Sequence, residues 1–177
     1  MLVNLRPHVY YYNIPSQVHV AGANTVHWDL FNADPARLIR VVSVKQIPDV
    51  SIAVTGIVFA WKLARTTAIG VAGVAQTAWL PDLSQTAAPT LITCRSKPTS
   101  GATEGVILYN YAIQSEETNA ATILLASLGG LELVPTCLSL DEERRGVFLR
   151  YGQGLRCVQI TNSAEGNTGW IIGFSVE

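Results

Sequence analysis

The sequence predicts an all-β protein, a two-sheet antiparallel β-sandwich of jelly-roll type. Segments in which apolar and polar residues alternate recur along the chain, separated by clusters of Gly, Pro, Asn and Asp. This spacing of turn residues favours a sandwich or barrel. Two long stretches between strands, 68–89 and 116–130, favour Greek-key connections. We expect one domain over residues 1–177, with about eight to ten strands and at most one short helix.

The first expected strand, 8–14, contains three consecutive tyrosines and stops at Pro15, because proline cannot continue a central strand. The second, 24–31, separates apolar from polar side chains. Its apolar face would consist of Val26, Trp28 and Leu30, and its polar face of Thr25, His27 and Asp29.

The third expected strand, 38–47, is apolar on both faces, so we expect the core to cover one face and a neighbouring subunit the other. Strict alternation places Leu38, Val42 and Val44 on one face and Ile39, Val41 and Ile47 on the other. The segment 56–66 alternates well and is a fourth strand. Glycines and prolines interrupt 68–89, which predicts a long excursion over the surface.

Further strands are expected at 90–95 and 105–113. The segment 115–128 fits either a short helix or a strand, since Glu residues follow Ser115 while the apolar run 123–125 suits a sheet. Shorter strands are expected at 131–134, 138–140 and 147–150, with a charged hairpin tip at 141–146.

The C-terminal strand, 169–177, has the heaviest apolar face, so we expect it to lie centrally in its sheet and to form core. That face consists of Trp170, Ile172, Phe174 and Val176. Turn-forming residues at 162–167 separate it from the segment 155–161. We therefore expect 155–161 to be its antiparallel partner.

The composition is poor in charge, with 14% charged and 49% hydrophobic residues and a formal net charge of −1. This balance suits a protein that hides surface in contacts with other subunits and gives no electrostatic case for nucleic acid or an anionic membrane. No apolar run has the length of a signal peptide or a membrane span. Cys94, Cys137 and Cys157 have neither metal nor disulfide spacing, which predicts buried thiols in a protein made in a reducing cytoplasm.

No recognisable catalytic, cofactor-binding or metal-binding motif is present, so we expect no enzyme. The three histidines, His8, His19 and His27, lack metal-site spacing, and exposed or capped structural roles are the preferred interpretation. The glycines at 70 and 73 are not followed by the Lys-Ser/Thr of a phosphate loop. A sugar site could be built from Trp28, Asp29 and Trp170, but core packing is the preferred role of both tryptophans.

The last third of the chain resembles small structural proteins of tailed-bacteriophage virions, above all jelly-roll capsid decoration (cement) proteins. The resemblance rests on Leu-Arg-Tyr-Gly-Gln-Gly-Leu-Arg at 149–156 and Gly-Asn-Thr-Gly-Trp-Ile-Ile-Gly-Phe at 166–174, with similar wording at 115–120, 126–131 and 159–163. It implies a homo-oligomer, often a trimer, that is made in the host cytoplasm and binds the major capsid protein on the virion surface.

Two function classes stay open at this point. The first is a decoration protein that stabilises the shell, and the second is a tail-associated or receptor-binding module with a groove for glycans. An enzyme such as a depolymerase is a third, weaker interpretation. The expected oligomer or capsid contacts lie in the first strand and the surface excursion, at Tyr10, Tyr12, Trp79, Leu80 and Leu83.

Overall fold

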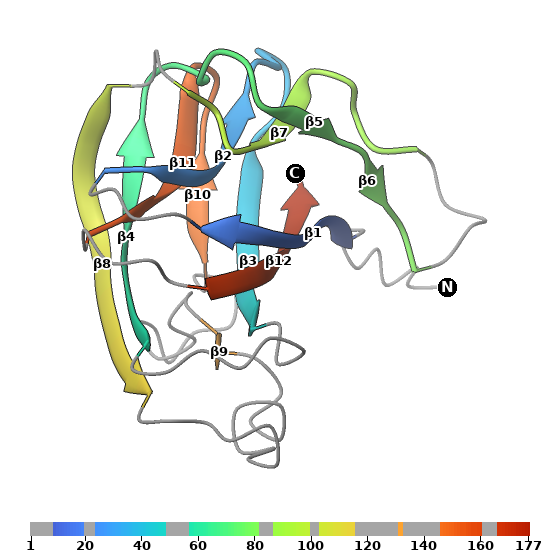
Figure 1. Cartoon of the computed structure of the whole chain (residues 1–177). Helices are drawn as coiled ribbons and strands as arrows, with labels where there is room; N and C mark the ends of the chain where they lie inside the picture. The colour runs from blue at the N-terminus through green and yellow to red at the C-terminus, as the bar shows by residue number, and fades with distance from the viewer. Residues whose placement is uncertain are drawn as a thin grey trace.

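The structure, a computed structural model, is a sandwich of two antiparallel β-sheets (Figure 1). It describes residues 9–19, 24–48, 57–81, 87–99, 103–115, 131–132, 146–160 and 166–177. Within these ranges every regular element is a strand, and no helix could cross a membrane.

Sheet A has the strand order β10-β3-β12-β1-β6, with β9 paired to β3. Sheet B has the order β5-β7-β2-β11-β4-β8. The bounds are, in chain order, β1 Val9–His19, β2 Val26–Asn32, β3 Ile39–Pro48, β4 Ile57–Thr66, β5 Val74–Gln76, β6 Ala78–Trp79, β7 Ile92–Ser96, β8 Glu104–Ser115, β9 Leu131–Glu132, β10 Val147–Leu149, β11 Gln153–Gln159 and β12 Gly166–Val176.

The order of the principal strands is that of a jelly roll. Strands β1, β2, β3 and β4 alternate between sheets A and B, and so do β10, β11 and β12. Together with β8, these strands form two blocks of four. The block in sheet A is β10-β3-β12-β1, and the block in sheet B is β2-β11-β4-β8. Neighbours in these blocks are distant in sequence, as Greek-key connections require. The predicted all-β sandwich is therefore confirmed.

The predicted hairpin between 155–161 and 169–177 is wrong. Strand β12 does lie centrally, between β3 and β1 in sheet A, but β11 lies in sheet B between β2 and β4. The chain crosses the sandwich between β11 and β12, so the two strands face each other across the core. Turn residues indicate that a chain reverses, but they do not determine which sheet the next strand joins.

Register shifts in several strand pairs change the pattern expected from alternation, and one of them lies in β3. In β3, Gly173 pairs with Ser43 and Phe174 with Val41, which leaves Val42 as an extra residue. Such a bulge reverses the parity of the strand. The core side of β3 consequently carries Ile39, Val41, Val44 and Gln46, instead of the two sets predicted, and Ile47 is exposed.

Strand β1 does not end at Pro15. It continues to His19, with a register shift against β12 between Ile14 and Gln17. Proline is tolerated at a bulge because no ladder hydrogen bond is needed from its nitrogen. The shift lets β1 pair with β12 from Val9 to His19. The three tyrosines lie before the shift, where the pairing is regular.

The core is aromatic and contains most of the large apolar residues that the alternation assigned to it. The rings of Tyr10 and Tyr12 stack on Phe174 with centroids 5.4 and 5.3 Å apart. Trp170 packs edge-on against Trp61 and Trp28 in the same interior. Cys94 and Cys157 are buried free thiols, as predicted, and Cys137 lies outside the described residues.

The excursion after β4 adds a strand to each sheet instead of only passing over the surface. Strand β6 pairs with β1 at the edge of sheet A, and β5 pairs with β7 at the edge of sheet B. Three predicted segments lie largely outside the described residues. Of the helix or strand expected at 115–128, only Ser115 is described. The strand expected at 138–140 is not described, and only Gly146 of the hairpin tip at 141–146 is.

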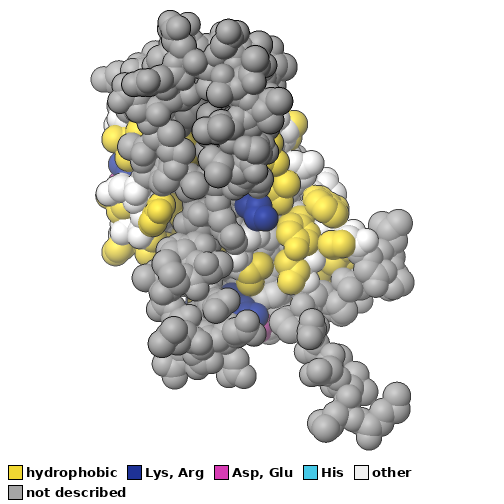
Figure 2. All heavy atoms as spheres, turned by 90° about the horizontal axis from the view of Figure 1, so that it is seen from below, with side chains coloured by type: hydrophobic (Ala, Val, Ile, Leu, Met, Phe, Trp, Pro, Cys, Tyr) yellow, Lys and Arg dark blue, Asp and Glu magenta, His cyan; other side chains and the backbone are white. Residues whose placement is uncertain are grey.

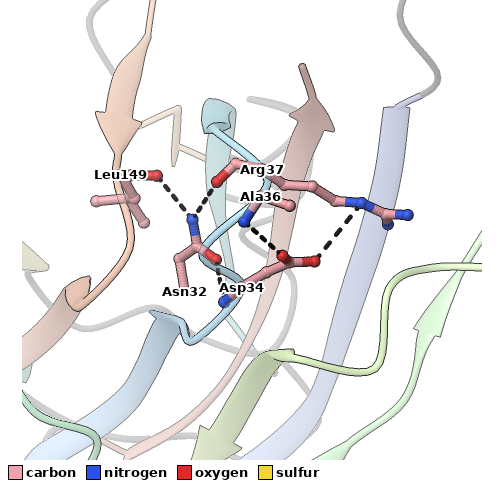
Figure 3. A network of polar contacts seen from close by, with 5 residues as sticks. All are labelled: Asn32, Asp34, Ala36, Arg37 and Leu149. Atoms are coloured by element: carbon pink, nitrogen blue, oxygen red, sulfur yellow. Dashed lines mark hydrogen bonds and ion pairs between the residues drawn. The ribbon is translucent and has the colours of Figure 1, made fainter.

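A polar network fastens one end of the sandwich (Figure 3). The Asn32 amide donates to the carbonyls of Arg37 and Leu149 at 2.9 and 3.0 Å, and its oxygen accepts from the Asp34 amide at 2.9 Å. Asp34 in turn accepts from the Ala36 amide and pairs with Arg37. Asn32 thus holds the turn between β2 and β3 against the end of β10, a structural role.

Candidate functional site

The outer side of sheet A carries an aromatic surface, here called the Tyr11 face, made of Val9, Tyr11, Asn13, Trp79 and Ile171. Because Tyr10, Tyr12 and Ile14 point into the core, the alternate residues of β1 point outward. The register then aligns Trp79, Tyr11, Gly173 and Ser43 in one row across four strands. A second row aligns Asn13, Ile171 and Lys45.

Tyr11 is held in place by the two residues beside it. Its ring stacks on Trp79 with centroids 5.2 Å apart and an angle of 30°. On the other side it lies over Gly173, where a Cβ atom would come within 3.1 Å of the Tyr11 ring. Because Gly173 has no side chain, there is room for the Tyr11 ring, and the ring shields the glycine backbone from solvent. Trp79 is 45% exposed, which makes it available to a partner.

The five predicted contact residues have different positions. Tyr10 and Tyr12 are 5% and 2% exposed and belong to the core, and the Tyr12 hydroxyl donates to the carbonyl of Ile92 across the sandwich at 2.7 Å. Leu80 is half-buried against the core, Trp79 is exposed, and Leu83 lies outside the described residues. A contact role stays a prediction for Trp79, Leu80 and Leu83. The two tyrosines point into the core, and the half-buried residue between them, Tyr11, points outward.

A cavity of about 340 Å³ opens between β6 and β7, behind the Tyr11 face. Its walls are Tyr12, the residues 75–78 and 87–90, and the strand residues 92–95. The Tyr12 hydroxyl is engaged by Ile92, and burial raises the pKa of this phenol well above its usual range. The Gln76 amide donates to Val74 and Ser96. The Tyr12 hydroxyl and the Gln76 amide are thus hydrogen-bonded within the protein, and the described residues that line the cavity include no carboxylate.

A second apolar surface, here called the β8 edge, consists of Val106, Ile107 and Leu108. Strand β8 is the outermost strand of sheet B and pairs with β4 alone among the described strands. Its register against β4 shifts twice between Glu104 and Tyr109. These bulges bring three consecutive apolar side chains to the surface, with Val106 at 69% exposure.

The tryptophans and Asp29 do not build a sugar site. Trp28 and Trp170 are fully enclosed in the sandwich, as the preferred core assignment predicted. Asp29 is also buried, under the segment after β4, where its carboxylate accepts a hydrogen bond from the Gly70 amide. Burial raises the pKa of Asp29, while the Gly70 hydrogen bond and the neighbouring Arg156 and Arg95 oppose this rise.

His27 is buried, which corrects the expectation of an exposed or capped histidine. Trp28 pairs with Cys157 and Val26 with Val158, so His27 is an extra residue in β2. It packs edge-on against Trp61 and Trp170 with centroids 6.5 and 5.8 Å apart. Burial, with a smaller contribution from Lys97, lowers the pKa of His27 to about 3, so the imidazole is neutral at physiological pH. Among the described residues no group of three His, Cys, Asp or Glu could hold a metal ion.

Comparison with known proteins finds no matching family model, no matching curated protein and no matching solved structure.

Two of these surfaces were missed from the sequence. Tyr11 could have been found by extending the alternation rule, since inward Tyr10 and Tyr12 imply an outward residue between them. The β8 edge had no such signal. Alternation predicts Ile107 and Tyr109 on one side, and only the bulges bring Val106, Ile107 and Leu108 to the surface together.

Proposed function

We propose that this protein is a structural protein of a tailed-phage virion, a decoration protein that forms a homo-oligomer and binds the major capsid protein on the assembled shell. It would be made in the host cytoplasm, and its role would be to stabilise the shell without catalysis. The resemblance of residues 149–156 and 166–174 to such proteins supports this proposal and suggests three copies per oligomer.

One observation carries the proposal, namely two separate apolar surfaces on one small sandwich. Strands β6 and β8, which bear Trp79 and Val106, lie at opposite sides of the molecule (Figure 1). Figure 2 shows apolar side chains gathered on the side where Figure 1 draws β6. A decoration protein needs two such surfaces, one for its own copies and one for the shell.

The mechanism would rest on multivalency. An oligomer presents several Tyr11 faces at once, so that each bound copy raises the effective concentration of the next. Each contact with the shell could then be weak. Exposed aromatic residues such as Trp79 are the side chains most often found at the centre of protein interfaces.

Co-sedimentation tests this proposal. Purified protein is mixed with shells that lack it, and binding should be saturable with a fixed ratio to the capsid protein. Trp79→Ala should weaken binding about tenfold or more, because aromatic anchors carry much of the free energy of an interface. Tyr151→Ala is the matched control, since Tyr151 is exposed at 64% but lies in the turn between β10 and β11. An absence of binding would reject the proposal.

The alternative, a receptor-binding or tail-associated module, is favoured by one feature of the same face. Asn13 is exposed two residues from Tyr11, and aromatic rings with a nearby amide suit the stacking of a sugar. However, the face is the outer side of a sheet, whereas this alternative predicted a groove. Binding of host-surface glycans by protein that ignores shells would favour this alternative.

A further inference from the structure

The β8 edge is unusual for the rim of a sheet. Strand β8 is twelve residues long, and natural proteins protect such edges with charged residues, prolines or bulges. Here the bulges are present, but the side chains that they expose are Val106, Ile107 and Leu108. An apolar run of this kind normally marks a contact surface.

The charges around this edge are compatible with a second copy of the same chain. Glu104 is the only Asp, Glu, Lys, Arg or His residue in β8, and its carboxylate pairs with Lys62 of β4 at 2.8 Å. When two β8 strands meet antiparallel about Ile107, the two Glu104 residues lie at opposite ends of the contact. No like charges then face each other, and Val106 of one copy meets Leu108 of the other.

We propose that the β8 edge is the surface through which one copy of this protein contacts a second copy, around a two-fold axis close to Ile107. A two-fold contact uses the same patch on both partners, so a patch must be compatible with itself. The β8 edge meets this condition, since its centre is apolar and its single acid is neutralised within its own chain. The inference deepens the proposed function and leaves the Tyr11 face for the shell.

This contact predicts an even number of copies, whereas the resemblance to decoration proteins by itself suggests three. An even number arises from a dimer or from two trimers joined through β8. Light scattering on the purified protein at micromolar concentration distinguishes these states without any shell. Its result therefore stands apart from the test of the proposed function.

The variant Val106→Lys with Leu108→Lys should halve the mass of the particle, because four lysines would meet at the axis. Val74→Lys is the matched control, a valine of 64% exposure on β5, the opposite edge of sheet B. It should leave the mass unchanged. Melting curves of both variants verify that the fold is kept.

A second experiment does not depend on introduced charge. Ile107→Cys, in a Cys137→Ala background, should form a disulfide-linked dimer on oxidation, and Val74→Cys should not. A wild-type monomer or trimer, an unchanged mass of the double-lysine variant, or an Ile107→Cys protein that stays unlinked would each overturn the inference. Loss of shell binding by the double-lysine variant with its mass unchanged would also overturn it, since the edge would then contact the capsid protein.

Discussion

The carboxylate of Asp29 on β2 accepts a hydrogen bond from the backbone amide of Gly70, a residue 41 positions further along the chain. This contact fixes the segment after β4 over the outer side of sheet B. The segment is also held by Arg95, which donates to the carbonyl of Ala72, and by Thr99, whose amide donates to Val71. The first part of the segment 68–89, which was predicted to be a surface excursion, therefore packs over β2.

Asp29 gives the stability of the protein a definite pH dependence. Because burial raises the pKa of Asp29 above its ordinary 3.8, the folded state holds this proton to a higher pH than the unfolded state. The contribution of Asp29 to the free energy of unfolding therefore falls as the pH rises above 3.8, until the carboxyl of the folded protein is ionised.

Asp29→Asn removes this dependence and keeps an oxygen that can accept from Gly70. Urea unfolding of both proteins between about pH 4 and pH 7 measures the difference. The free energy of unfolding of the wild type, relative to that of the variant, should be higher at about pH 4 than at about pH 7. A difference that grows in the opposite direction would show that Arg95 and Arg156 outweigh the cost of burial.

His27 predicts the opposite slope. Its pKa lies at about 3 in the folded protein, against an ordinary value of 6.5, so the unfolded chain binds the proton first as the pH falls. Stability from neutral His27 is complete above pH 6.5 and is lost as the pH falls towards 3, at about 1.4 kcal/mol for each unit of pKa difference. His27→Gln should abolish this loss in urea unfolding, and an unchanged acid profile of the variant would refute the assignment.

The core prediction concerns Phe174, on which both Tyr10 and Tyr12 stack. Phe174→Ala should lower the free energy of unfolding by about 3–5 kcal/mol, because the cavity cannot be filled by the two rigid rings. Tyr151→Ala should change it by less than about 0.5 kcal/mol, since that ring is exposed. Equal melting temperatures of these two variants would contradict the position of β12 in the core.

The thiols should be dispensable. Burial raises the pKa of the Cys94 thiol, and both Cys94 and Cys157 are enclosed by apolar neighbours, so neither is reactive. Replacement of Cys94, Cys137 and Cys157 together by Ala or Val should preserve the oligomer and shell binding, at a cost below about 1.5 kcal/mol for each site. Loss of assembly on reduction or on metal removal from the wild type would show that a thiol has a chemical role.

Much of the fold was predictable from alternation alone. The central position of β12 and the core roles of Trp28, Trp170 and Phe174 follow from the period of two, because a strand with one heavy apolar face must bury it. The wiring was predicted only at the level of a jelly roll. The partner of β11 depends on long-range packing, and no local pattern distinguishes a hairpin from a crossing between sheets.

The candidate site was less predictable, for a related reason. Bulges at Val42 and His27 and along β8 each shift the alternation by one residue, and single extra residues leave no mark in a sequence. They turn His27 inward and bring Val106, Ile107 and Leu108 outward together. The sequence predicts a contact role for Trp79, which is exposed, whereas the outward position of Tyr11 was not predicted because two core tyrosines of the same type flank it.

Electron cryo-microscopy of shells incubated with the protein tests the central claim most directly. Shells that lack the protein are mixed with a saturating amount, and the reconstruction is compared with that of untreated shells. A decoration protein should add density at equivalent positions over the whole shell surface, with the Tyr11 face turned towards the capsid protein. Shells without added density, or density confined to the tail of complete particles, would contradict it.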